Sequence, residues 1–214
     1  MTRIWLLTAS VIATAALAAP AGASGYVVTI GTHAAINFAP WCGDQEFDAC
    51  RFQCLWPRNQ INHAGYIDAV EFDAKSKPGG ATFYDVRVWL CHTNKTELEA
   101  TFDNNYTGFT PVQVKNDKEL SIPQQVGYVD IGIRPHLFYY NNTNNLLMEI
   151  RWHTSDWHTV PCWVSKQTKG RVLAFRDNGM TGNIQDYTEC IRFHIETMTG
   201  VVPASFGKVK ALFR

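Results

Sequence analysis

The sequence predicts an all-β protein, a two-sheet antiparallel sandwich of jelly-roll type that is stapled by disulfide bonds. Strand formers outnumber helix formers, with 19 Thr and 16 Val against 12 Leu. Several segments alternate apolar and polar residues with the period of two that half-buried strands show. Clusters of turn-forming residues separate these segments. About ten strands without helical periodicity between them are typical of a sandwich fold.

Two segments show the alternation most clearly. In residues 82–93, one face carries Tyr84, Val86, Val88 and Leu90. The other face of that segment carries Phe83, Asp85, Arg87, Trp89 and Cys91. In residues 145–154, one face carries Leu146, Met148, Ile150 and Trp152. Its other face carries Glu149, Arg151 and His153, and we expect that face to contact water.

The remaining strands are expected in shorter segments. They are residues 26–30, 66–72, 97–102, 111–115, 129–133, 136–140, 159–166, 171–175 and 191–196. Residues 36–62 are expected to be irregular, with one short helical turn around residues 52–56. We expect a β-sandwich domain over residues 24–196 and a C-terminal tail over residues 197–214.

The N-terminus predicts export. Arg3 is followed by an apolar run from Ile4 to Ala18, then by Pro20 and the small residues that precede a cleavage site after Ala23. This is the pattern of a secretory signal peptide over residues 1–23. The run is shorter than the roughly 20 apolar residues of a membrane span. We therefore expect a secreted or cell-surface protein without a membrane span once the signal is removed.

Composition excludes two classes of protein. The hydrophobic share of 46% excludes an intrinsically disordered chain. Lys+Arg and Asp+Glu balance at 19 each, which leaves no basic footprint for nucleic acid. The expected partners are therefore other copies of the chain, other surface proteins or glycans.

Six cysteines remain in the exported chain: Cys42, Cys50, Cys54, Cys91, Cys162 and Cys190. An even number in an oxidising compartment predicts up to three disulfides, which six cysteines can form in 15 pairings. The alternative is a zinc site built from Cys50, Cys54, Cys91 and His92.

The sequence contains no catalytic signature such as G-x-S-x-G, H-E-x-x-H or a phosphate-binding glycine loop. We therefore predict no catalytic residues and no required cofactor. A secreted hydrolase remains a third hypothesis, because a glycosidase would need only two carboxylates across a groove. The carboxylates available for this are Glu71, Asp73, Glu149, Asp156 and Glu189.

Aromatic and polar clusters supply the candidate binding residues. Trp56, Trp89 and Trp157 are candidate platforms for a sugar ring, with Trp89 favoured because it shares the polar face of its strand. A transition metal could be held by His153, Asp156 and His158, which are of suitable ligand types. The simpler interpretation is that they belong to a polar loop. Oxygen ligands for Ca²⁺ could come from Asp44, Glu46 and Asp48. The simpler interpretation of these three residues is a solvated acidic turn.

The order of these signals resembles β-sandwich modules of bacterial secreted and cell-surface proteins, similar to cleaved-adhesin modules. The resemblance covers most of residues 26–196 and rests on short motifs. They are Ile30-Gly31-Thr32, Pro40, Arg51-x-Gln53-x-Leu55, Gln60-Ile61, Ala64-Gly65-x-Ile67, Val70-x-Phe72, Phe138-x-Tyr140 and residues 145–152. It implies a jelly-roll adhesion module.

Together these features predict a non-enzymatic structural or adhesion protein that self-assembles on the cell surface or into an extracellular filament. Edge strands and a terminal segment are the parts from which strand-addition assemblies are made, here residues 26–35 and 199–214. The alternative is a carbohydrate-binding module.

Overall fold

The computed structural model describes residues 24–43, 48–75, 80–156, 158–175 and 179–197. The expected signal peptide and all but the first residue of the expected tail lie outside these ranges. The strands are β1 (Ser24–Ile30), β2 (Ala35–Asn37), β3 (Cys50–Trp56), β4 (Gly65–Ala74), β5 (Ala81–Thr93), β6 (Val112–Ile122), β7 (Gly127–Asp130), β8 (Phe138–Tyr140), β9 (Asn145–Trp152), β10 (Thr154–Ser155), β11 (Cys162–Ala174), β12 (Asn183–Glu189) and β13 (Ile191–Thr197). The helices are α1 (Arg58–Ile61) and the 3-10 turn η1 (Phe102–Asn105).

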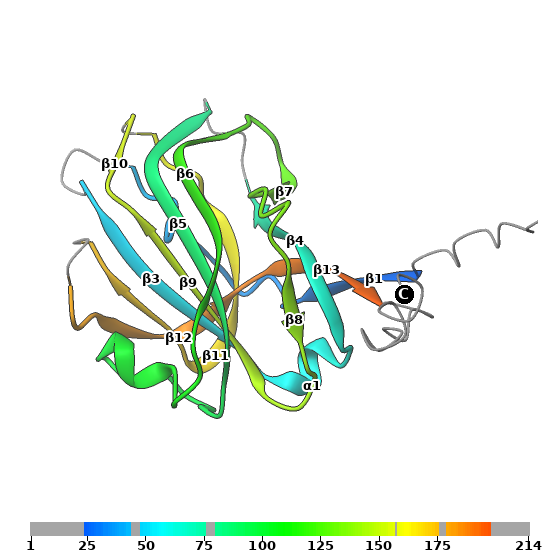
Figure 1. Cartoon of the computed structure of the whole chain (residues 1–214). Coiled ribbons are helices and arrows are strands. Elements are labelled where there is room, and N and C mark those ends of the chain that lie inside the picture. Colours follow the sequence, from blue (N-terminus) through cyan, green and yellow to red (C-terminus); the bar gives the residue numbers. More distant parts are fainter. Residues whose placement is uncertain (1–23, 44–47, 76–79, 157, 176–178, 198–214) are drawn as a thin grey trace, which may run out of the picture. The chain divides into compact units, whose positions relative to one another are not determined.

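All strands belong to one antiparallel sheet of 13 strands, which confirms the all-β prediction (Figure 1). Its main path runs β1-β13-β4-β11-β3-β9-β5-β10. β4 and β11 are joined by a single residue pair, Ala74 with Cys162. The sheet thus has two halves, β1-β13-β4 with β7 and β8, and β11-β3-β9-β5-β10 with β2, β6 and β12.

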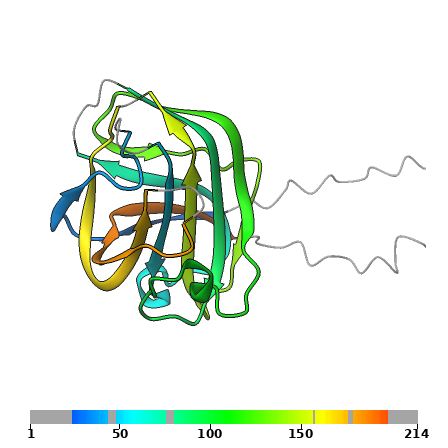
Figure 2. The same ribbon diagram turned by 90° about the vertical axis from the view of Figure 1, so that its left-hand side faces the viewer.

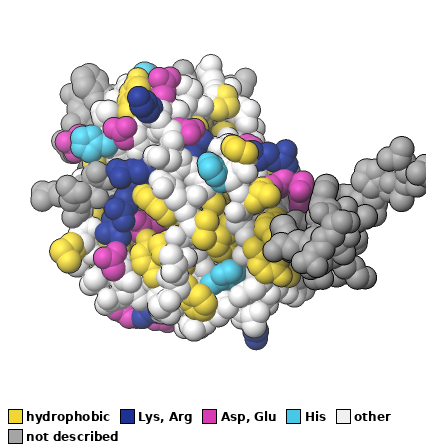
Figure 3. Space-filling view, viewed as in Figure 1, with side chains coloured by type: hydrophobic (Ala, Val, Ile, Leu, Met, Phe, Trp, Pro, Cys, Tyr) yellow, Lys and Arg dark blue, Asp and Glu magenta, His cyan; other side chains and the backbone are white. Residues whose placement is uncertain are grey.

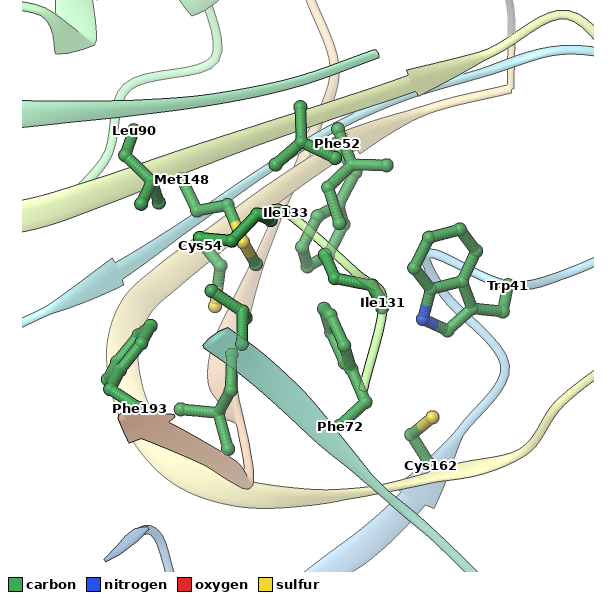
Figure 4. Packing of buried hydrophobic residues seen from close by; sticks show 14 of the residues in the cluster. Trp41, Phe52, Cys54, Phe72, Leu90, Ile131, Ile133, Met148, Cys162 and Phe193 are labelled. Carbon is green, nitrogen blue, oxygen red and sulfur yellow. The ribbon is translucent and has the colours of Figure 1, made fainter. Parts of the chain in front are cut away.

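The two halves curl around a common core (Figure 2). Phe72 of β4 and Phe193 of β13 belong to the same buried cluster as Phe52 of β3 and Met148 of β9. Figure 4 shows these side chains pointing toward one another from opposite halves. Trp152 closes one end of the core, where its indole N–H donates to the carbonyl oxygen of Pro40 at 2.7 Å.

The face of β9 that was expected to be wet is covered over part of its length, while Arg151 is partly exposed and His153, which follows the strand, is exposed. Leu147 packs in a second apolar cluster with Leu98 and Phe102, and Glu149 is only 1% exposed. The covering segment is the stretch around η1, where a strand over residues 97–102 was predicted; that prediction is wrong. The backbone N–H of Leu98 donates to the carbonyl oxygen of Lys169. The segment therefore lies over the sheet and does not form one of its strands.

The interpretation of residues 36–62 as irregular is wrong for β3 and α1, whereas residues 38–43 and 48–49 do lie outside strands and helices. Residues 50–56 form β3, and the helical turn expected there lies at α1. All seven residues of β3 are buried. Since both faces of the strand are covered, its sequence shows no alternation, and the polar residues Arg51 and Gln53 disguise it further.

One row of alternation in β5 is interrupted. Asp85 has a positive φ of 52°. Phe83 and Val86 are therefore both buried, whereas Tyr84, which was predicted to share the face of Val86, is partly exposed. A residue in the left-handed region turns the following side chain to the other face.

Candidate functional site

Two edges of the sheet differ in their chemistry. β1 lies at one end of the strand path and, among the described residues, pairs with β13 alone. Its sequence, SGYVVTI, contains no charged side chain. Tyr26 is 43% exposed and Val27 is 58% exposed. This edge offers backbone hydrogen-bonding groups beside apolar side chains.

The edge strand β6 is protected by comparison. Within the described residues it pairs only with β5. It carries three consecutive exposed charges, Asp117, Lys118 and Glu119. Charged side chains on an edge strand are a common device against pairing with another chain. The absence of such charges on β1 therefore makes it better suited to strand addition than β6.

A polar cleft lies where β11 is interrupted by an irregularity. The pairing with β12 shifts between Lys166 and Arg171, and Lys169 within this interval has a φ of 45°. The cleft has a volume of about 530 Å³ and is lined by Asn37, Lys166, Arg171, Gln185, Asp186 and Tyr187.

Behind the cleft lies a fully buried ion pair. Arg171 donates through Nη1 to Oε1 of Glu189 at 2.7 Å, and both side chains are completely buried. Burial raises the pKa of Glu189 to about 7, although the Arg171 guanidinium acts in the opposite direction. The Cys54 thiol lies nearby, since its sulfur accepts the backbone N–H of Glu189 at 3.4 Å. Burial raises the pKa of this thiol to about 12.

A second buried carboxylate, Glu149, is held by many donors. It accepts hydrogen bonds from Arg51, Gln53 at 2.6 Å, Tyr106 at 2.5 Å and Arg151. A carboxylate so fully satisfied is a structural element that fixes η1 over the sheet. Neither Glu149 nor Glu189 is exposed in a groove as one of a pair of hydrolytic carboxylates would be.

The predicted sugar platforms fall in different surroundings. Trp56 is completely buried and packs edge-on against Phe193, so it offers no ring face to a ligand. Trp89 is partly exposed, with the guanidinium of Arg151 5.1 Å from its ring centroid. Trp157 lies outside the described residues.

The predicted metal ligands come together only in part. Nδ1 of His158 lies 3.3 Å from Oδ1 of Asp156, while His153 is exposed on its own. Asp44 and Glu46 lie outside the described residues, and Asp48 is exposed. Within the described ranges, no three His, Cys, Asp or Glu side chains form a group that could hold a metal ion.

The six cysteine side chains are all buried, and the structure joins no two of them in a disulfide. Cys50 and Cys54 share β3, Cys91 lies in β5 and Cys162 lies in β11. Cys91 donates to the carbonyl oxygen of His92 at 3.1 Å. The disulfide pairing stays a prediction.

The closest approach to catalytic geometry is a histidine-carboxylate pair. His33 lies with Nε2 at 2.7 Å from Oδ2 of Asp73 and stacks on Trp163, with ring centroids 4.3 Å apart. Among the described residues, no Ser, Thr or Cys side chain hydrogen-bonds to His33.

Sequence reasoning named Glu189 only as one carboxylate among five and did not identify its partner Arg171. The missing step was β12, which was not predicted. Its alternation is weak because Thr188 and Glu189 are both buried polar residues. The signal that could have revealed the pair is the presence of polar residues of opposite charge, Arg171 and Glu189, on two consecutive segments that form an antiparallel hairpin.

No protein-family model, no curated protein and no solved structure matches this chain. Within the described residues no helix is long and apolar enough to cross a membrane. On the face drawn in Figure 3, acidic and basic side chains lie side by side, in keeping with the balanced charge.

Proposed function

We propose that this chain is a non-enzymatic extracellular structural or adhesion protein, of the kind that bacterial cell-surface modules represent, and that it self-associates through β1. The observation that carries the proposal is the uncharged edge of β1, with Tyr26 and Val27 exposed. An edge strand of this kind is a template for pairing with another strand.

The partner that fits this edge is β1 of a second copy. Antiparallel pairing of two β1 strands is a two-fold contact, in which residue i of one copy faces residue j of the other and residue j faces residue i. A side chain faces its own copy only where it lies on the two-fold axis. β1 carries no charged side chain, so no register of this pairing sets like charges against each other.

This contact closes in a dimer, because a two-fold contact uses the same surface on both copies. A filament needs a second, different contact. The predicted segment 199–214 would be its source, but it lies outside the described residues. In this proposal the β1 contact forms the dimer, and a second contact joins dimers into a filament. The mass of the particle in solution distinguishes the two.

The finer architecture belongs to the same proposal. We propose that the two curled halves are the layers of a jelly-roll sandwich, and that the cysteines form disulfides in the exported protein. Buried thiols near a common core support this. Mass spectrometry of the unreduced, digested protein tests it: linked cysteine peptides are expected, and six unlinked cysteines would contradict it.

The test of β1 pairing is the substitution Val27→Lys, which places a charge on the exposed edge. Val126→Lys is the matched control, since Val126 is 58% exposed like Val27 but lies outside β1. Light scattering of the mature protein should show a dimer or larger particle for the unchanged chain and for Val126→Lys. It should show a monomer for Val27→Lys.

Truncation after Gly200 separates the edge from the tail. If truncation abolishes association while Val27→Lys leaves it intact, the tail and not the β1 edge carries the contact. Circular dichroism of each variant shows whether the fold is retained.

A glycan ligand is the second candidate function, favoured by the partly exposed Trp89 beside Arg151. A sugar stacked on Trp89 should change tryptophan fluorescence in the unchanged protein and not in Trp89→Phe. Equal responses of the two proteins across a glycan panel would contradict this role.

A further inference from the structure

The polar cleft between β11 and β12 contains an arginine with unused hydrogen-bonding capacity. Arg171 is completely buried, and its Nη1 atom is engaged with Glu189. Its Nε and Nη2 atoms have no hydrogen-bond partner among the described residues. A buried guanidinium donor without an acceptor costs about 1 to 3 kcal/mol, so such a group calls for an explanation.

The two unpartnered atoms lie on one edge of the guanidinium group. Nε–H and one Nη2–H point in parallel, which is the arrangement that binds both oxygens of a carboxylate. Arg171 thus holds Glu189 through Nη1, and its Nε and Nη2 edge has no hydrogen-bond partner among the described residues, while its Cζ lies 5.5 Å from the centroid of the Tyr187 ring. Lys166 lines the same cleft and adds a second positive charge.

The rest of the lining suits hydroxyl groups. Asn37 and Gln185 carry side-chain amides that can both donate and accept hydrogen bonds. Oε1 of Gln185 is itself buried without a partner among the described residues. A ligand that combines a carboxylate with several hydroxyls would use all of these groups.

We propose that this cleft binds the carboxylate of a sugar acid, with the Nε and Nη2 edge of Arg171 as the bidentate donor and Asn37, Lys166 and Gln185 around the hydroxyls. The site is distinct from the β1 edge and does not depend on self-association. Because both Arg171 atoms are closed off from solvent, entry requires the long side chains of the lining, such as Lys166 and Gln185, to rotate.

The local charge is compatible with an added anion. Arg171 faces Glu189, and the cleft itself carries Lys166 and Asp186. Asp186 is engaged by the backbone N–H of Lys169 at 2.9 Å. Because burial raises the pKa of Glu189 to about 7, its carboxyl group is partly protonated near neutral pH. The positive charge of Arg171 is then only partly matched within the protein.

Calorimetric titration with trigalacturonic acid tests the proposal, and its methyl ester is the matched ligand control. The acid should bind and the ester should bind at least about tenfold more weakly, because the ester lacks the anionic oxygen pair. Equal affinity for acid and ester, or no binding of either, would overturn the proposal. Displacement of the acid by millimolar inorganic phosphate would show a general oxyanion site and overturn the assignment to sugar acids.

Variants then locate the site. Lys166→Ala should weaken binding of the acid, whereas Lys118→Ala, on the distant edge strand β6, should not. Arg171→Lys removes the bidentate edge but keeps a charge beside Glu189, and it should abolish the preference for acid over ester. If Arg171→Lys fails to fold, the Lys166→Ala result decides: unchanged affinity in that variant would overturn the placement in this cleft.

Discussion

The buried pair of Arg171 and Glu189 makes a specific prediction about stability and pH. In the unfolded chain Glu189 has the ordinary pKa of 4.5, and in the folded chain burial raises its pKa to about 7. A group whose pKa is higher in the folded state contributes stability that is fully present below the unfolded pKa. That contribution is lost as the pH rises through the folded pKa. The fold should therefore weaken between pH 5 and pH 8.

The size of this loss follows from the two values. Each pKa unit corresponds to about 1.4 kcal/mol of differential stability. A rise from 4.5 to about 7 then gives a loss of about 2 to 3 kcal/mol between pH 5 and pH 8. The other ionisable groups near Glu189 are the thiols of Cys54, Cys162 and Cys190. Burial raises the pKa of each thiol, so they stay protonated over this range.

The assay is urea unfolding of the unchanged chain and of Glu189→Gln at pH 5, 6, 7 and 8. Glutamine keeps an acceptor for Nη1 of Arg171 but has no titrating proton. From pH 5 to pH 8 the free energy of unfolding of the unchanged chain should fall by about 2 to 3 kcal/mol relative to that of Glu189→Gln. Glu97→Gln, at an exposed ion pair with Lys169, is the control and should follow the unchanged chain.

A parallel pH dependence of the unchanged chain and Glu189→Gln would refute this reasoning. A shift of opposite sign would mean that Arg171 keeps Glu189 ionised in the folded protein. In that case the attraction between the two charges would outweigh the cost of burial.

Two further predictions concern buried hydrogen bonds. Glu149→Ala should lower the free energy of unfolding by about 3 to 5 kcal/mol, because it leaves Arg51 and Arg151 without their common carboxylate; urea unfolding measures this, and a loss below about 1 kcal/mol would contradict it. Trp152→Phe should cost about 1 to 3 kcal/mol, because the carbonyl oxygen of Pro40 loses its buried donor; a thermal unfolding midpoint equal to that of the unchanged chain would argue against this role.

The predictability of this fold from sequence depended on burial. β13 was predicted, because its inner residues Ile191, Phe193 and Ile195 alternate with residues that are only partly buried or exposed. β3 was missed, because both of its faces are covered and its buried Arg51 and Gln53 resemble surface residues. Alternation reports a strand only when one of its faces contacts water.

The candidate sites were less predictable than the fold. Residues 26–35 were predicted to take part in assembly because an edge strand near a terminus suits strand addition, and the absence of charge in β1 can also be read from the sequence. The cleft was not, because Arg171 and Glu189 meet only through the pairing of β11 with β12. Nothing local in either segment indicates that both side chains are buried.

The proposed self-association depends on the pairing of β1 with β1 of a second copy. Multi-angle light scattering of the mature, oxidised protein together with Val27→Lys tests it most directly. We predict a particle of at least twice the chain mass for the unchanged protein and a folded monomer for Val27→Lys. A monomer for the unchanged protein at all concentrations, or association unaffected by Val27→Lys, would contradict it.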